Sequence, residues 1–135
     1  MPGINCGACS FSGCDGYAKA MAQGNAGATN CTPGGPTTRQ ALSEILGVEV
    51  GEIEKVAAFV RCNGTCEYTN SKMDYAGTTT CYGANQIFGG QQECLFGCMG
   101  YGDCQAVCEY DAIQIVDGIA KINPAKCVGC LKCLA

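Results

Sequence analysis

The sequence contains no histidine and no tryptophan, and only 7% of its 135 residues are aromatic. The lack of histidine removes the commonest general base of enzymes and a common metal ligand. The lack of large aromatic side chains, combined with 20 glycines, leaves little material for an apolar core. Something other than apolar burial must therefore stabilise the fold.

Long apolar stretches and clusters of positive charge are also missing. No segment reaches the ~20 apolar residues that cross a membrane, and the start "MPGINCGAC" lacks the basic and apolar parts of a secretory signal. Eight basic and twelve acidic residues give a net charge of -4. Nucleic acid and anionic membranes are therefore poor partners, and a basic protein surface suits the chain better. We expect a soluble, intracellular protein.

Cysteine is the abundant residue, with fourteen in the chain. Such a density is typical of disulfide frameworks in secreted proteins or of metal sites in a reducing compartment. Since no export signal is present, metal sites are favoured. Disulfide pairing and a four-cysteine zinc site are the alternatives, although zinc sites normally show two separated C-x2-C pairs.

The first four cysteines have the spacing C-x2-C-x4-C-x16-C, and four thiolates suit either zinc or an iron-sulfur cluster. Glycines between them let the backbone wrap closely and turn its amides toward sulfur. This feature stabilises the sulfides of a cluster more than it helps a bare zinc ion. The predicted ligands of a first cluster are Cys6, Cys9, Cys14 and Cys31.

The segment "KCVGCLKC" has the spacing C-x2-C-x2-C, which begins the bacterial ferredoxin pattern. Upstream, Cys104 and Cys108 form C-x3-C and match the end of a first ferredoxin run, although Glu109 stands where proline is usual. In such pairs of runs the fourth cysteine of each run ligates the other cluster. The predicted ligands of a second cluster are therefore Cys108, Cys127, Cys130 and Cys133.

The remaining cysteines follow looser spacings. Cys94, Cys98 and Cys104 are the predicted ligands of a third cluster, with an incomplete set and a longer loop, "CMGYGDC", than ferredoxins have. Cys62, Cys66 and Cys81 are candidates for a further cluster, and buried free thiols account for them equally well.

The predicted fold class is a small, irregular α+β iron-sulfur protein. Residues 1–50 are expected to form a four-cysteine cluster module, and residues 51–135 a ferredoxin-like module. Tyr17 and Met21 predict the core face of a short helix within 13–24. A β-hairpin is predicted from Ile113 to Ile122 around the turn Asp117-Gly118.

Three further elements are expected. A helix within 33–47 is predicted to have a capping box of Thr37 and Gln40, a stop at Gly47, and an apolar face. A buried strand is predicted from about Lys55 to Arg61, and a short helix near Gly83 to Phe88. The expected apolar face of the helix within 33–47 consists of Leu42, Ile45 and Leu46.

Several of these segments together resemble one family across nearly the whole length. They are "PGINCGACSFSGCDGYAKA" with "CTPGG", then "VRCNGTC", "YAGTTTC", "GGQQECLFGCMGYGDCQAVCEYDAI" and "KCVGCLKC". The sequence resembles the B-type subunit of the Rnf complex, a membrane-bound ferredoxin:NAD oxidoreductase that pumps sodium ions or protons. Members of this family begin with a membrane-anchoring helix and continue past the last cysteine here, so the chain is expected to be a fragment.

The resemblance implies an electron-transfer subunit with at least two [4Fe-4S] clusters, and three or more are expected. Its implied partners are soluble ferredoxin and the other subunits of the complex, at the cytoplasmic face of the bacterial cell membrane. The alternatives are a free-standing polyferredoxin-type carrier and a structural zinc scaffold. Since histidine is absent and no G-x-G-x-x-G motif follows a strand, we expect no substrate chemistry within this chain.

Overall fold

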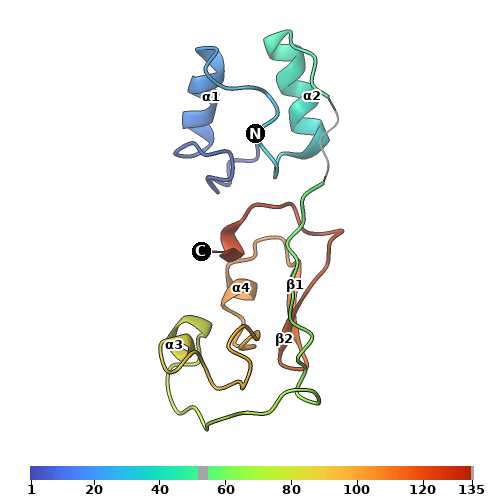
Figure 1. Cartoon of the computed structure of the whole chain (residues 1–135). Coiled ribbons are helices and arrows are strands. Elements are labelled where there is room, and N and C mark those ends of the chain that lie inside the picture. The colour runs from blue at the N-terminus through green and yellow to red at the C-terminus, as the bar shows by residue number, and fades with distance from the viewer. Residues whose placement is uncertain (52–54, 135) are drawn as a thin grey trace. The chain divides into compact units, whose positions relative to one another are not determined.

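A computed structural model describes residues 1–51 and 55–134 (Figure 1). The chain is a small α+β fold, as predicted, and it divides into two compact units. Unit 1 comprises Met1–Ala57 with Cys127–Leu131, and unit 2 comprises Ala58–Lys126 with the residues from Lys132 on. The proposed division at residue 50 stays a prediction. In the part of the chain that the structure describes, no helix is long and apolar enough to span a membrane.

Two helices form the frame of unit 1, α1 (Cys14–Ala22) and α2 (Gly35–Leu46) (Figure 1). Tyr17, which is only 1% exposed, and Met21 are buried on one face of α1, as predicted. Cys31 is buried with them, and Leu42 and Leu46 of α2 pack against this cluster. The small core of unit 1 therefore includes one of the predicted cluster ligands.

The start of α2 differs from the prediction. The helix begins at Gly35. No side chain forms a capping hydrogen bond at the start of this helix, whose residues are all described. The predicted capping box of Thr37 and Gln40 is therefore wrong. Pro36 explains the earlier start, since its fixed φ suits the first helical turn. The stop at Gly47 is confirmed by its left-handed φ of 65°. Ile45 is 78% exposed, so it does not belong to the apolar face.

The predicted buried strand from Lys55 to Arg61 is also wrong. Residues 55–61, all of them described, form no strand, and Phe59 is 83% exposed. A strand needs a neighbour for its backbone hydrogen bonds. The two strands of the described sheet pair only with each other, so this apolar segment has no sheet to join.

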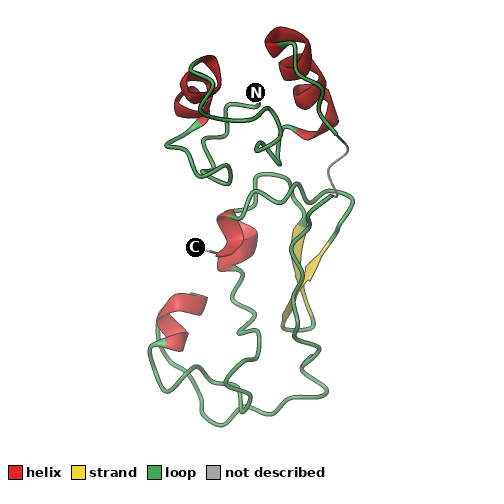
Figure 2. Ribbon diagram, turned by 45° about the horizontal axis from the view of Figure 1, so that its top comes forward, coloured by secondary structure: helices red, strands yellow, loops and turns green. Residues whose placement is uncertain are grey.

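The predicted hairpin is confirmed in unit 2, where β1 (Ile113–Val116) pairs antiparallel with β2 (Ile119–Ile122) (Figure 2). Asp117 and Gly118 make the turn with φ values of 51° and 78°. Positive φ at both positions is what a two-residue turn of type I′ requires. Ile113 and Ile119 are buried on the hairpin.

Three short helices complete unit 2: α3 (Cys81–Asn85), α4 (Asp103–Ala106) and the 3-10 helix η1 (Lys132–Leu134). Helix α3 begins two residues before the predicted position because the hydroxyl of Thr80 accepts a 3.0 Å hydrogen bond from the Gly83 N–H. Helices α4 and η1 contact each other. The two-stranded sheet therefore lies in a unit that consists largely of loops.

Candidate metal centre

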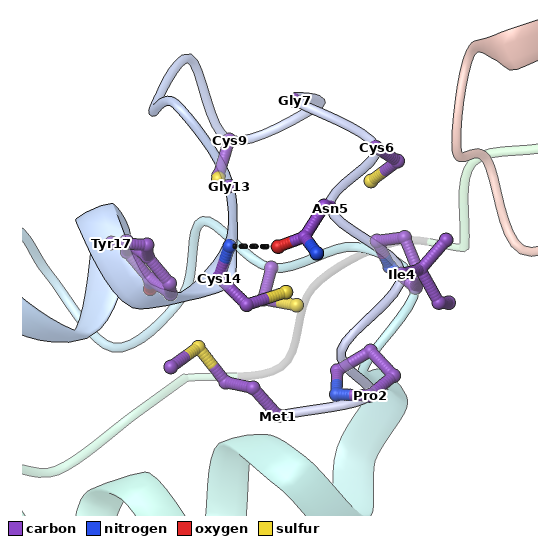
Figure 3. A pocket seen from close by; sticks show the side chains of 12 residues that line it. Met1, Pro2, Ile4, Asn5, Cys6, Gly7, Cys9, Gly13, Cys14 and Tyr17 are labelled. Carbon is purple, nitrogen blue, oxygen red and sulfur yellow. Dashed lines mark hydrogen bonds between the residues drawn. The ribbon is translucent and has the colours of Figure 1, made fainter.

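Four cysteines of unit 1 surround one pocket (Figure 3). Cys6 and Cys9 lie on the loop before α1, Cys14 is the first residue of α1, and Cys31 is buried ahead of α2. Burial raises the pKa of the Cys31 thiol, and the facing thiols of Cys14, Cys9 and Cys6 raise it further. The structure thus brings together all four residues that the spacing assigned to the first cluster.

Asn5 closes the loop that carries Cys6 and Cys9. Its Oδ1 accepts a 2.8 Å hydrogen bond from the backbone N–H of Cys14 (Figure 3). Asn5 has a left-handed φ of 50°, a conformation that asparagine tolerates better than most residues. Gly13 has φ 110°, and a Cβ there would lie 2.8 Å from Asn5 Oδ1. The close approach of these two residues therefore requires glycine at position 13.

Tyr17 fixes the segment that leads to Cys31. Its hydroxyl donates to the Gly27 carbonyl at 2.5 Å and accepts from the Asn30 N–H at 3.2 Å. Burial raises the pKa of Tyr17, so the hydroxyl keeps the proton that it donates. The helical spacing of Tyr17 predicts only its place in the core, and the cysteine spacing does not point to Asn5. An asparagine directly before the first cysteine was the available signal.

The predicted ligands of the second cluster are divided between the units. Cys127 and Cys130 belong to unit 1, where the Thr32 hydroxyl donates to the Gly129 carbonyl at 3.3 Å. This hydrogen bond places the segment of Cys127 and Cys130 beside the loop that carries Cys31.

Cys108 and Cys133 belong to unit 2. Cys108 follows α4, Cys133 lies in η1, and these two helices contact each other. Lys132 and Glu109 form an ion pair of 2.5 Å beside them. The structure thus brings these two cysteine segments together, and the complete four-ligand set stays a prediction.

A third group of thiols lies in unit 2. Burial raises the pKa of Cys104, and the thiols of Cys98 and Cys81 raise it further. Spacing places Cys104 and Cys98 in the predicted third cluster, whereas it groups Cys81 with Cys62 and Cys66. Cys94, the third member of the predicted group, is exposed.

The remaining two cysteines of unit 2, Cys62 and Cys66, form hydrogen bonds with backbone groups. Cys62 Sγ accepts from the Gly64 N–H at 3.4 Å, and the Cys66 thiol donates to the Asp117 carbonyl at 3.4 Å. A Cβ at Gly118 would lie 2.8 Å from Cys66 Sγ, so this thiol packs against the hairpin turn.

The donor chemistry fits iron-sulfur clusters. All fourteen cysteines, every one within the described residues, are free thiols. Across residues 1–51 and 55–134, no group of three or more His, Cys, Asp or Glu side chains is placed so that it could hold a single metal ion. Thiolate sulfur is the ligand that iron-sulfur clusters take.

A family model with the description "Putative Fe-S cluster" matches residues 1–33, which include all four cysteines of the pocket. The chain is an iron-sulfur protein. It is 43% identical over 99% of its length to the B-type subunit of the Na(+)-translocating ferredoxin:NAD(+) oxidoreductase complex of Acetobacterium woodii. It is also 35% identical over 96% of its length to the B-type subunit of the ion-translocating oxidoreductase complex of Methanosarcina acetivorans.

A third relative, at 33% identity over 85% of the chain, is the B-type subunit of the proton-translocating ferredoxin:NAD(+) oxidoreductase complex of Clostridium ljungdahlii. All three relatives are named as B-type subunits of ion-translocating oxidoreductase complexes. This confirms the resemblance found in the cysteine motifs. The matches span 40%, 50% and 41% of the lengths of the three relatives, in the order given.

Proposed function

We propose that this chain is an electron-transfer subunit that carries several [4Fe-4S] clusters. It passes low-potential electrons between soluble ferredoxin and a membrane-bound complex that reduces NAD and pumps Na+ or H+. The observation that carries this proposal is the meeting of four thiols around one pocket in a chain similar to these B-type subunits.

A bound cluster supplies one-electron redox chemistry, and the chain's own residues hold and tune it. Cys6, Cys9, Cys14 and Cys31 are the proposed ligands of the first [4Fe-4S] cluster. Asn5 and Tyr17 fix the two ends of this ligand set through the hydrogen bonds described above. Burial of Cys31 and backbone amides near sulfur set the reduction potential of the cluster, because both change the relative stability of its oxidised and reduced states.

The contact between Thr32 and Gly129 supports transfer between the first and second clusters. Thr32 follows Cys31 and Gly129 precedes Cys130, so the 3.3 Å hydrogen bond joins neighbours of ligands from both proposed sites. If both sites hold clusters, this contact within unit 1 would keep segments that carry their ligands close together, which favours transfer between them. The proposed second [4Fe-4S] cluster has the ligands Cys108, Cys127, Cys130 and Cys133.

The proposed partners follow from the names of the relatives and from charge. Two of the relatives are named as parts of ferredoxin:NAD(+) oxidoreductase complexes, which supports ferredoxin as the electron donor or acceptor. Such a chain works with the other subunits of the complex at the cytoplasmic face of the membrane. Its net charge of -4 suits a partner protein with a basic surface.

Anaerobic stopped-flow mixing of the oxidised protein with reduced ferredoxin tests this function. The broad visible absorbance of the clusters should bleach as electrons arrive, and Cys31→Ser should lower the amplitude by one cluster. A protein that carries its clusters and yet takes no electrons from ferredoxin would contradict the proposed partner. A colourless protein that contains zinc would instead support the structural scaffold.

A further inference from the structure

We infer that unit 2 docks onto another subunit of the complex through an exposed apolar patch in an acidic part of the chain. The inference rests on the proposed function, since it takes the partner from the complex named there. The partner surface that fits has an apolar centre surrounded by lysine and arginine. The side chains of the patch are between 44% and 95% exposed, and they are Ile87, Phe88, Leu95 and Phe96.

The first of two tight turns, residues 87–90, presents Phe88. The Gly90 N–H donates to the Ile87 carbonyl at 2.9 Å. Phe88 has φ 49° and Gly89 has φ 73°, and positive φ at both central positions is typical of a type I′ turn. Asparagine, aspartate and glycine suit these positions, whereas a bulky aromatic residue is strained there. Phe88 is 82% exposed, so packing within the described chain offsets little of this strain.

The strain at Phe88 is unusual for this chain. Six non-glycine residues among those described have positive φ, and three of them are asparagine or aspartate, which tolerate it. Lys72 Nζ donates to the Phe88 carbonyl at 2.9 Å and so holds the turn in its conformation. A fold that maintains a strained backbone to expose an aromatic ring indicates that the ring has a function outside the chain.

The second turn, residues 94–97, lies against the first. The N–H of its last residue donates to the carbonyl of its first at 3.0 Å, so Leu95 and Phe96 are its central residues. A Cβ at Gly89 would lie 3.1 Å from Leu95 Cδ2, which places the Leu95 side chain beside the first turn. Turn centres normally have small or polar residues. Large apolar side chains on two adjoining turns are instead typical of a protein interaction site.

The charge around the patch identifies the partner. From residue 62 to residue 120 the sequence has seven acidic residues and one basic residue, Lys72. Glu93 lies between the two turns, and Asp103 Oδ2 accepts from the Tyr82 N–H at 3.2 Å, at the start of α3. Acidic side chains beside an apolar patch attract lysine and arginine and repel an acidic surface. The partner therefore has a basic rim.

Binding of the whole chain to the purified complex assembled without this subunit tests the patch. Phe88→Gly removes the ring and suits a φ of 49°, so the variant should fold while its affinity falls about tenfold or more. Titration calorimetry measures the affinity, and circular dichroism checks the fold. Leu95→Ser in the second turn should also weaken binding. Wild-type affinity in either folded variant would overturn the inference.

Phe59→Gly is the matched control. Phe59 is 83% exposed, as Phe88 is, and it lies outside the patch. The control should bind the complex with wild-type affinity. A loss equal to that of Phe88→Gly would show that exposed rings contribute wherever they lie, and it would overturn the inference.

The dependence of binding on salt tests the basic rim of the partner. The affinity of the wild-type chain should fall as ionic strength rises, because salt screens attraction between exposed charges. Glu93→Gln should slow association and flatten this dependence. An affinity that rises with salt, or that does not respond to it, would overturn the proposed charge of the partner.

Ferredoxin is the other protein that could occupy the patch. Loss of electron uptake from reduced ferredoxin in Phe88→Gly, with binding to the complex unchanged, would assign the patch to ferredoxin and overturn the inference. If the wild-type chain and Phe88→Gly bind the complex equally, the inference alone fails. If the wild-type chain does not bind the complex, the proposed function fails with it.

Discussion

The side chain of Asn5 and the backbone of Cys14 are joined by a 2.8 Å hydrogen bond that spans nine residues. The loop between them carries Cys6 and Cys9, so one asparagine closes the segment that holds three of the four thiols of the pocket. The bond restrains the backbone around these thiols, and a restrained backbone loses less entropy on binding.

Loss of the Asn5 amide should weaken the first cluster. Asn5→Gly keeps the left-handed backbone and removes the acceptor, which should cost about 1 kcal/mol, the net worth of a typical hydrogen bond. The measurement is the rate at which a chelator removes iron from the protein, and it should rise several-fold. An unchanged rate would show that the bond does not support the site.

Asn5→Asp is the complementary variant, because it keeps an acceptor oxygen and adds a negative charge beside the pocket. Cluster content should match the wild type. The reduction potential of the first cluster should fall, since added negative charge disfavours the reduced form. A potentiometric titration followed by paramagnetic resonance measures it, and a rise in potential would contradict the placement of Asn5.

Tyr17→Phe should destabilise unit 1 by about 1–3 kcal/mol, because two backbone groups lose their partner. These groups are the Gly27 carbonyl and the Asn30 N–H. The free energy of unfolding from anaerobic denaturant titration checks this value. Tyr68→Phe is the control, since Tyr68 is exposed, and it should change the free energy little.

Cys31→Ser should lose about one four-iron cluster's worth of iron and sulfide, because a hydroxyl is a poorer ligand for iron than a thiolate. The double variant with Cys9→Ser should lose no more than Cys31→Ser alone. Iron and sulfide analysis of the reconstituted protein gives both values. Full cluster content in Cys31→Ser would remove Cys31 from the ligand set.

Removal of iron should unfold much of the chain. Among the described residues, Tyr17 and Ile119 are the largest fully buried side chains, which is little apolar burial for 135 residues. Cluster ligation must supply stability that the core does not. Circular dichroism before and after chelation under anaerobic conditions measures the effect. Retention of the native spectrum in the iron-free protein would refute this expectation.

The second cluster can be tested through Cys108 and Cys130. If both ligate it, Cys108→Ser and Cys130→Ser should disturb the same signal, and the double variant should lose no more iron than either single one. Cys9→Ser should add its loss independently. Losses from Cys108→Ser and Cys130→Ser that sum to two clusters would exclude the ferredoxin-like pairing.

The sequence predicted those features that depend on residues close together in the chain. The Asp117-Gly118 turn between alternating apolar residues indicated the hairpin, and C-x2-C-x4-C located three thiols of one pocket. Gly47 ended its helix as expected. In each case neighbours in the sequence are also neighbours in space.

The wrong strand prediction depends on a neighbouring strand, which the sequence alone does not reveal. Lys55–Arg61 has strand composition, but a strand also needs a neighbouring strand, and the described sheet offers none. The predicted grouping of Cys81 with Cys62 and Cys66 stays a prediction, and the hydrogen bond between Tyr82 and Asp103, which joins the helices of Cys81 and Cys104, could not be foreseen from spacing. Such long-range contacts depend on how irregular loops fold, and no periodicity in the sequence encodes them.

The most direct test of the account is a reductive titration of the anaerobically reconstituted chain, followed by visible absorbance and paramagnetic resonance. Each [4Fe-4S] cluster accepts one electron, so the account predicts uptake of more than one electron per chain, with bleaching and the resonance of reduced clusters. A chain that remains colourless, accepts no electrons and contains zinc would contradict it.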